Sequence, residues 1–113
     1  MGGRIASQVV AAGTPVDALA LFAYPLHPPG NPLKMRDEHL PAIDAPALFC
    51  SGTRDAFGST EELEAASAKV GDATVHWLHA ADHGFNVLKS SGRTKEQIQE
   101  EAIGALLDWL HSI

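Results

Sequence analysis

The sequence is short of the residues that several classes of protein require. Its 113 residues hold one cysteine, Cys50, so no disulfide can form within the chain, and we expect a reducing, cytoplasmic location. Basic residues number 8 against 14 acidic ones, a formal net charge of −6, and form no tract that could neutralise a row of phosphates. This argues against a nucleic-acid partner. No apolar run approaches the roughly 18 residues that a membrane span needs, so we expect no membrane partner.

Apolar runs are nevertheless present, at spacings that predict strands. Ala18–Tyr24 and Ala47–Gly52 are continuous and apolar, which is typical of strands covered on both faces. Ala73–Leu78 predicts a third strand, with Val75 and Trp77 on one face and His76 and Leu78 on the other. Three strands of a buried sheet are therefore expected.

Helical patterns separate these strands. Gly3–Ala12 is rich in small aliphatic residues and is followed by stop signals at Gly13–Pro15, which predicts a buried helix. Two capping-box patterns, Ser59 with Glu62 and Thr94 with Gln97, predict helix starts, the first helix running to about Gly71. The apolar stripe expected to pack the last helix on the core comprises Ile98, Ala102, Leu106, Trp109, Leu110 and Ile113. The six prolines of residues 25–46 leave room for at most one short helix, around Arg36–Leu40.

The alternation of helices and strands predicts an α/β fold. A single domain over residues 1–113 is expected, with at least three parallel strands and helices on both sides in three layers. In a parallel sheet, the carboxyl ends of all strands lie along one edge, where ligand sites form. Three loops would meet at that edge: Tyr24–Pro29, Gly52–Asp55 and His79–Phe85.

Two of these loops carry side chains suited to acid–base chemistry. Asp55 follows the second strand and His83 follows the third. A carboxylate that holds an imidazole in one tautomer makes the imidazole a general base, whereas each residue could also be an ordinary turn residue. Asp82 is a rival for the acid, although neighbouring residues seldom point toward each other.

The order of these features resembles the C-terminal half of the α/β-hydrolase fold, and most closely the dienelactone-hydrolase-like branch. The segments that carry the resemblance are Met1-Gly2-Gly3-Arg4, Tyr24-Pro25-Leu26-His27-Pro28-Pro29-Gly30, Gly52-Thr53-Arg54-Asp55 and Asp82-His83-Gly84-Phe85. The resemblance implies serine-type ester or acyl hydrolysis of a small-molecule substrate, without metal or organic cofactor. It makes Asp55 the triad acid and His83 the base, and places Tyr24 and His27 near the substrate pocket.

One part of that family's pattern is missing. The nucleophile elbow, Gly-x-Ser-x-Gly, does not occur in these 113 residues. The resemblance aligns Met1 with the residue that follows the nucleophile serine, at the position whose main-chain nitrogen helps to bind the oxyanion. Cys50 and Ser51 are poor substitutes for the serine, because one lies in mid-strand and the other lacks the elbow. A metal site at His76, His79, Asp82 and His83 matches no zinc spacing.

Three interpretations follow from the missing serine. The chain could supply acid and base to a hydrolase whose nucleophile lies elsewhere, in which case it is inactive alone. It could instead be a non-catalytic interaction or oligomerisation module, since the strand at 18–24 would leave one edge unpaired and open to a second copy or a partner chain. Met1 could also be an internal methionine of a longer polypeptide.

Overall fold

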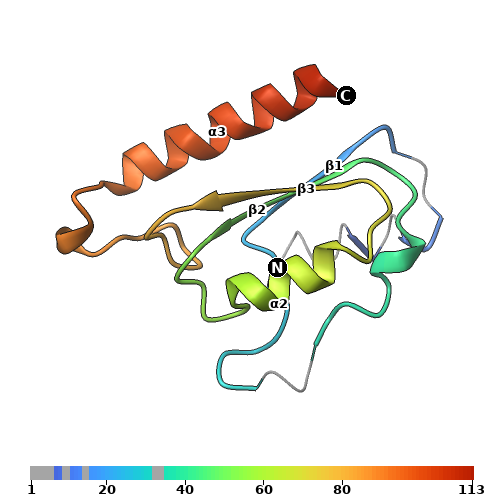
Figure 1. The fold of residues 1–113 in the computed structure, drawn as a ribbon, viewed down its shortest axis with the longest axis horizontal. Helices are drawn as coiled ribbons and strands as arrows, with labels where there is room; N and C mark the ends of the chain where they lie inside the picture. The colour runs from blue at the N-terminus through green and yellow to red at the C-terminus, as the bar shows by residue number, and fades with distance from the viewer. Residues whose placement is uncertain (1–6, 9–10, 14–15, 32–34) are drawn as a thin grey trace.

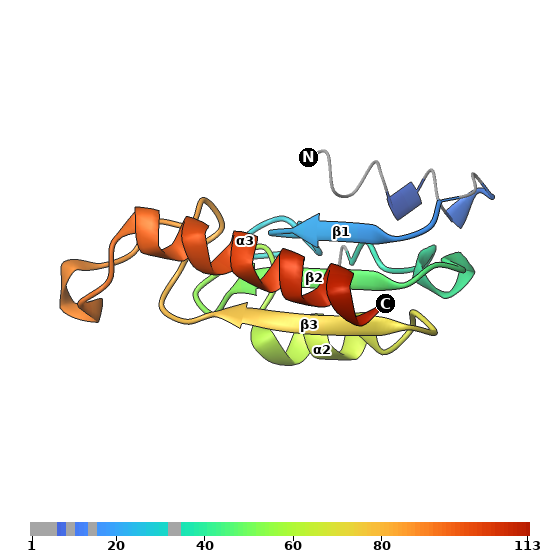
Figure 2. The same ribbon diagram turned by 90° about the horizontal axis from the view of Figure 1, so that it is seen from above.

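The computed structural model describes residues 7–8, 11–13, 16–31 and 35–113. Three parallel strands form one sheet in the order β1-β2-β3: β1 spans Leu19–Phe22, β2 spans Ala47–Gly52 and β3 spans Ala73–Leu78. Ala47 lies opposite Leu19 on one side and Ala73 on the other. Figure 2 shows the three arrows side by side and pointing the same way. The predicted α/β class and parallel pairing are confirmed.

The sheet is covered on its two faces by different helices. Helix α2, Thr60–Ser67, lies on one face and α3, Lys95–Ser112, lies on the other (Figure 1). Both predicted capping boxes form, so Ser59 and Thr94 accept hydrogen bonds from the main-chain N–H groups of Glu62 and Gln97. Two short 3-10 helices, Leu40–Ala42 and Lys89–Ser91, lie in the connections.

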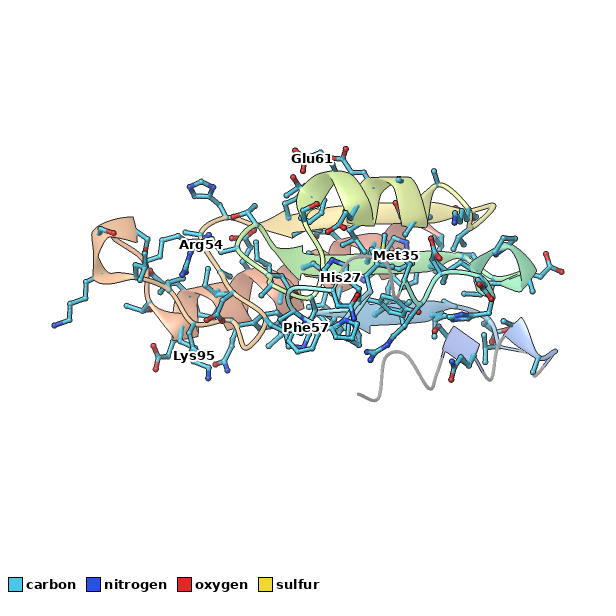
Figure 3. All side chains as sticks on the ribbon, turned by 90° about the horizontal axis from the view of Figure 1, so that it is seen from below. His27, Met35, Arg54, Phe57, Glu61 and Lys95 are labelled. Atoms are coloured by element: carbon cyan, nitrogen blue, oxygen red, sulfur yellow. The ribbon has the colours of Figure 1, made fainter. Side chains whose placement is uncertain are left out.

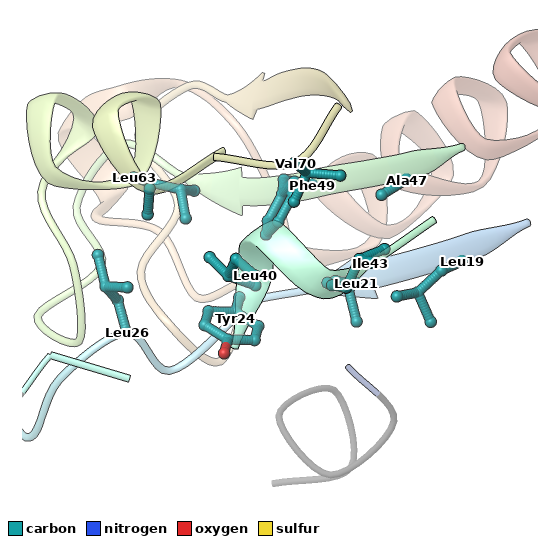
Figure 4. Packing of buried hydrophobic residues seen from close by; sticks show 11 residues of the cluster. Leu19, Leu21, Tyr24, Leu26, Leu40, Ile43, Ala47, Phe49, Leu63 and Val70 are labelled. Atoms are coloured by element: carbon teal, nitrogen blue, oxygen red, sulfur yellow. The ribbon is translucent and has the colours of Figure 1, made fainter. Parts of the chain in front are cut away.

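Strand β2 is the centre of the core. All six of its residues are buried, because neighbouring strands cover both of its edges and helices cover both of its faces. Its side chains alternate between two clusters, with Ala47 and Phe49 facing α2 and Leu48 and Cys50 facing α3. Figure 4 shows the α2-side cluster, where Leu63 of α2 packs toward the strands.

Several boundaries differ from the sequence-based ones. Strand β1 stops at Phe22 rather than Tyr24, because Ala23 adopts a positive φ of 52° that extended backbone cannot hold. Helix α2 ends at Ser67, before Gly71, and the short helix expected near Arg36 forms at Leu40–Ala42 instead. Most of the helix predicted at Gly3–Ala12 lies outside the described residues, of which Ser7, Gln8 and Ala11 are helical.

The apolar stripe of α3 is shorter than predicted. Ile98, Ala102 and Trp109 are buried against the sheet, whereas Leu110 and Ile113 are 44% and 54% exposed. Leu110 follows Trp109 by one residue, a rotation of about 100° round a helix, and therefore turns away from the sheet. In the parts of the chain that the structure describes, no helix combines the length and the apolar character needed to cross a bilayer.

Candidate functional site

Hydrogen bonds join the turn after β2 to the loop after β3. The main-chain N–H of Thr53 donates to the carbonyl of Leu78 at 3.2 Å, and that of Arg54 donates to the carbonyl of Ala81 at 2.9 Å. In return, the N–H of Ala80 donates to the Thr53 hydroxyl at 2.9 Å. These bonds fix the residues that follow in each loop relative to one another.

Gly52 allows this close approach. A Cβ added at Gly52 would lie 2.1 Å from the carbonyl oxygen of Ala81 and 2.6 Å from its carbonyl carbon. Both contacts are far inside van der Waals distance, so any other residue at this position would push the two loops apart. The glycine at the end of β2 is thus required by the loop that carries His83.

Asp55 and His83 meet at the end of these two loops. Nδ1 of His83 donates to Oδ2 of Asp55 at 2.8 Å. The Asp55 side chain is only 3% exposed, and its other oxygen, Oδ1, accepts from the main-chain N–H of Phe57 at 2.7 Å. The His83 side chain is 31% exposed, so the pair joins a buried carboxylate to an imidazole that reaches solvent.

The backbone around this edge holds several uncommon conformations. Ala80 and Phe85, which flank the His83 loop, have φ values of 68° and 64°, and Ala23 after β1 has 52°. Residues with a side chain seldom adopt a positive φ, and when they do they are often found at functional sites. All three lie beyond the carboxyl ends of strands.

The pair is arranged so that His83 can act as a base. With Nδ1–H donated to Asp55, a neutral ring carries its lone pair on Nε2, and no residue of the described chain hydrogen-bonds to that nitrogen. A buried carboxylate at Nδ1 also stabilises the imidazolium that forms when Nε2 takes a proton. The arrangement leaves Nε2 able to accept a proton from a hydroxyl group.

A family model described as an alpha/beta hydrolase domain matches residues 1–111 of the sequence. The chain belongs to the α/β-hydrolase family. Among the described residues, this membership agrees with the parallel sheet, the helices on both faces and the Asp and His loops at one edge of the sheet.

Three solved structures of hydrolases and esterases share the fold at low sequence identity. A serine hydrolase homologue from Coxiella burnetii gives a TM-score of 0.62 at 19% identity, over 93% of this chain and 45% of that one. A cold-adapted esterase from an Arctic intertidal metagenomic library, solved with zinc bound, gives a TM-score of 0.59 at 15% identity, over 90% of this chain and 44% of that one. The esterase domain of a Rhodothermus marinus protein gives a TM-score of 0.56 at 14% identity, over 73% of this chain and 49% of that one. The chain spans less than half the length of each of these structures.

The other candidates from the sequence are either hydrogen-bonded within their own loop or buried in a strand. Oδ1 of Asp82 accepts from the main-chain N–H groups of Gly84 and Asn86, so this carboxylate closes its own loop. Burial raises the pKa of the Cys50 thiol to about 12, which leaves it un-ionised at neutral pH. The Ser51 hydroxyl is buried and has no hydrogen-bond partner in the described part of the chain.

His27 and Tyr24 are both buried and hydrogen-bonded. The His27 ring lies 2.8 Å from the carbonyl of Pro28 through Nδ1 and 2.8 Å from Glu62 through Nε2. Both partners are acceptors, so both ring nitrogens donate together only when the ring is protonated, and the pKa of His27 is raised by the Pro28 hydrogen bond and then by Glu62. The Tyr24 hydroxyl donates to the carbonyl of Arg36 at 2.7 Å. Their role at a substrate pocket stays a prediction, and Met1 lies outside the described residues.

The histidine of β3 belongs to a network with α3. Nε2 of His76 donates to Glu101 at 2.6 Å, and Arg93 forms an ion pair with the same carboxylate while donating to the carbonyl of His79 at 2.8 Å. Burial opposes ionisation of Glu101, but the hydrogen bonds from His76 and Arg93 prevail and lower its pKa. Within the described residues, no group of three or more His, Cys, Asp and Glu side chains is placed to hold a metal ion.

One residue of the site has no counterpart in the sequence-based prediction. The ring of Phe57 stacks on the imidazole of His83, with centroids 4.0 Å apart and planes inclined by 27°. Phe57 lies two residues after Asp55, and nothing in its sequence context distinguishes it from an ordinary loop aromatic. Only the meeting of the two loops makes it part of the site.

Proposed function

We propose that this chain supplies the acid and the base of a serine-type ester or acyl hydrolase. The observation that carries the proposal is the 2.8 Å hydrogen bond from Nδ1 of His83 to the buried carboxylate of Asp55. Membership of the α/β-hydrolase family supports the same roles, because the triad of this fold runs in the order Ser, Asp, His.

The chemistry follows from the free nitrogen of His83. Nε2 takes the proton of a serine hydroxyl as its oxygen attacks the carbonyl carbon of an ester, and the imidazolium then returns that proton to the departing alcohol. The acyl group stays on the serine until a water molecule, deprotonated by the same nitrogen, displaces it as a carboxylic acid. Asp55 keeps the ring in the required tautomer throughout.

The serine itself is proposed to come from outside these 113 residues, which contain no Gly-x-Ser-x-Gly. The chain alone is therefore expected to show no His83-dependent turnover of a chromogenic acyl ester and no labelling by a serine-directed fluorophosphonate. His83→Asn serves as the matched control for both assays. Clear turnover that His83→Asn abolishes would overturn the external-serine part of the proposal. Placement in the dienelactone-hydrolase-like branch belongs to the same proposal.

A second candidate function, binding through an open sheet edge, is favoured by β1. Leu19 and Ala23 direct their N–H groups toward β2, to the carbonyls of Pro46 and Cys50. Since N–H directions alternate along a strand, those of Ala20 and Phe22 point to the outer edge, where the described residues provide no neighbouring strand. Phe22 beside that edge is 37% exposed, and Ile103 of α3, which lines a cleft with it, is 59% exposed.

This edge is proposed to pair with a second copy of the chain or with a segment that brings the serine. Ala20→Pro removes an outward N–H and leaves the β1–β2 hydrogen bonds in place, so it should abolish association. Sedimentation equilibrium measures the result, with Leu88→Pro as a control for the added proline, because Leu88 is exposed and its φ of −75° suits proline. A wild-type chain that stays monomeric at high concentration would count against self-association. Association that survives Ala20→Pro would exclude this edge as its site.

A further inference from the structure

We propose that Phe57 is a positioning residue of the Asp55–His83 pair, with its main chain orienting the carboxylate and its ring holding the plane of the imidazole. The proposal rests on the proposed function, because it assigns Phe57 a part in preparing His83 as a base. Three independent contacts of Phe57 carry it.

The first contact gives each of the two carboxylate oxygens of Asp55 a different hydrogen-bond donor. The main-chain N–H of Phe57 donates to Oδ1 at 2.7 Å, while Nδ1 of His83 donates to Oδ2 at 2.8 Å. A carboxylate held at one oxygen cannot rotate freely about its Cβ–Cγ bond. The second oxygen therefore stays directed at the imidazole.

The second contact restrains the imidazole itself. A single hydrogen bond at Nδ1 fixes one atom of the His83 ring but lets the ring swing about that bond. The Phe57 ring removes this freedom, because its centroid lies 4.0 Å from that of the imidazole and the planes are 27° apart. A phenyl face also attracts a cation, so the stack persists when Nε2 takes a proton.

The third contact explains why Phe57 is itself held still. Its carbonyl accepts a hydrogen bond from the N–H of His27 at 2.9 Å. The His27 ring is in turn bonded to Glu62, whose side chain also accepts from the N-cap residue of α2. Figure 3 shows His27 and Phe57 next to each other. Phe57 is thus tied to the start of α2 on one side and to the reactive histidine on the other.

The test uses the chain with ¹⁵N-labelled histidine. Long-range ¹H–¹⁵N spectra at a pH of about 9, where imidazoles are neutral, give the tautomer of each ring. In the wild type, His83 should be mainly the Nδ1–H tautomer. Phe57→Leu should reduce the ratio of that tautomer to the Nε2–H form by roughly 2- to 12-fold, the equivalent of one aromatic stack. Phe57→Tyr, which keeps a ring, should restore it.

A second arm separates this proposal from the proposed function. Asp55→Asn should change the His83 tautomer whether or not Phe57 acts. If Asp55→Asn changes the ratio of the two His83 tautomers and Phe57→Leu does not, the positioning role of Phe57 is wrong and the Asp55–His83 pair stands. If Asp55→Asn has no effect, the pair itself is refuted.

The wild-type protein provides a check that needs no variant. Stacking under the Phe57 ring should shift the ring protons of His83 upfield of those of the exposed His79. Unshifted His83 protons would overturn the proposal even if Phe57→Leu failed to fold.

Discussion

Replacing Gly52 by alanine is expected to be among the most disruptive single-methyl changes in this domain. The added Cβ would lie 2.1 Å from the carbonyl oxygen of Ala81 and 3.0 Å from that of Asp82. Both atoms are main chain, so no side chain can swing aside. The Ala81 carbonyl would have to retreat by about 1 Å to reach the 3.0 Å below which real Cβ contacts essentially never occur.

The size of the effect follows from what this retreat breaks. Overpacking a tight site costs about 1–3 kcal/mol. The Ala81 carbonyl also accepts the N–H of Arg54 at 2.9 Å, and losing that bond adds about 0.5–1.5 kcal/mol. The total, about 1.5–4.5 kcal/mol, is a large part of the roughly 5–15 kcal/mol by which a domain is stable.

Urea unfolding followed by circular dichroism measures this loss. With a slope of about 1–3 kcal/mol/M, the midpoint of Gly52→Ala should fall by at least roughly 0.5 M. Gly104→Ala is the matched control, because its Cβ would meet nothing within 4 Å and alanine favours a helix by about 0.5–1 kcal/mol. A Gly52→Ala midpoint equal to that of the wild type would refute the contact between the two loops.

Two further predictions concern pH and capping. The pKa of His27 is raised above 6.5 by its hydrogen bonds to Pro28 and Glu62, so its contribution to stability is complete below 6.5 and is lost as the pH rises through the folded-state pKa. The loss of unfolding free energy in His27→Gln should therefore be larger at a pH of about 6 than at about 9, and urea titrations showing equal losses would contradict this. Thr94→Ala removes the cap of α3 and should lower the free energy of unfolding by about 1 kcal/mol in thermal denaturation, whereas Ser90→Ala, at an exposed position of the 3-10 helix Lys89–Ser91, should cost little. Equal melting temperatures for the two variants would show that the cap contributes nothing.

The sequence allowed most of the fold to be predicted because its local signals agree. Continuous apolar runs marked β1 and β2, and the boxes at Ser59 and Thr94 marked the helix starts. The misplaced ends have local causes that composition does not reveal. Ala23 is apolar and suits a strand, yet its positive φ ends β1, and nothing in the run around it signals that turn.

The candidate site was predictable only in part. That Asp55 and His83 would come close followed from their positions after adjacent parallel strands. Their contact at 2.8 Å depends on Gly52 fitting against Ala81, which is a tertiary fact. The stack of Phe57 on His83 likewise arises only when the two loops meet. Periodicity describes single elements, whereas this site is made by the junction of two loops.

Ester hydrolysis decides whether His83 is the base of a serine hydrolase with Asp55 as its acid. The assay compares the 113-residue chain with the polypeptide translated from the whole open reading frame that contains it, each as wild type, His83→Asn and Asp55→Asn. We expect turnover only where a Gly-x-Ser segment is present, and we expect His83→Asn to abolish it and Asp55→Asn to reduce it strongly. Turnover from a serine-containing polypeptide that survives His83→Asn would contradict it.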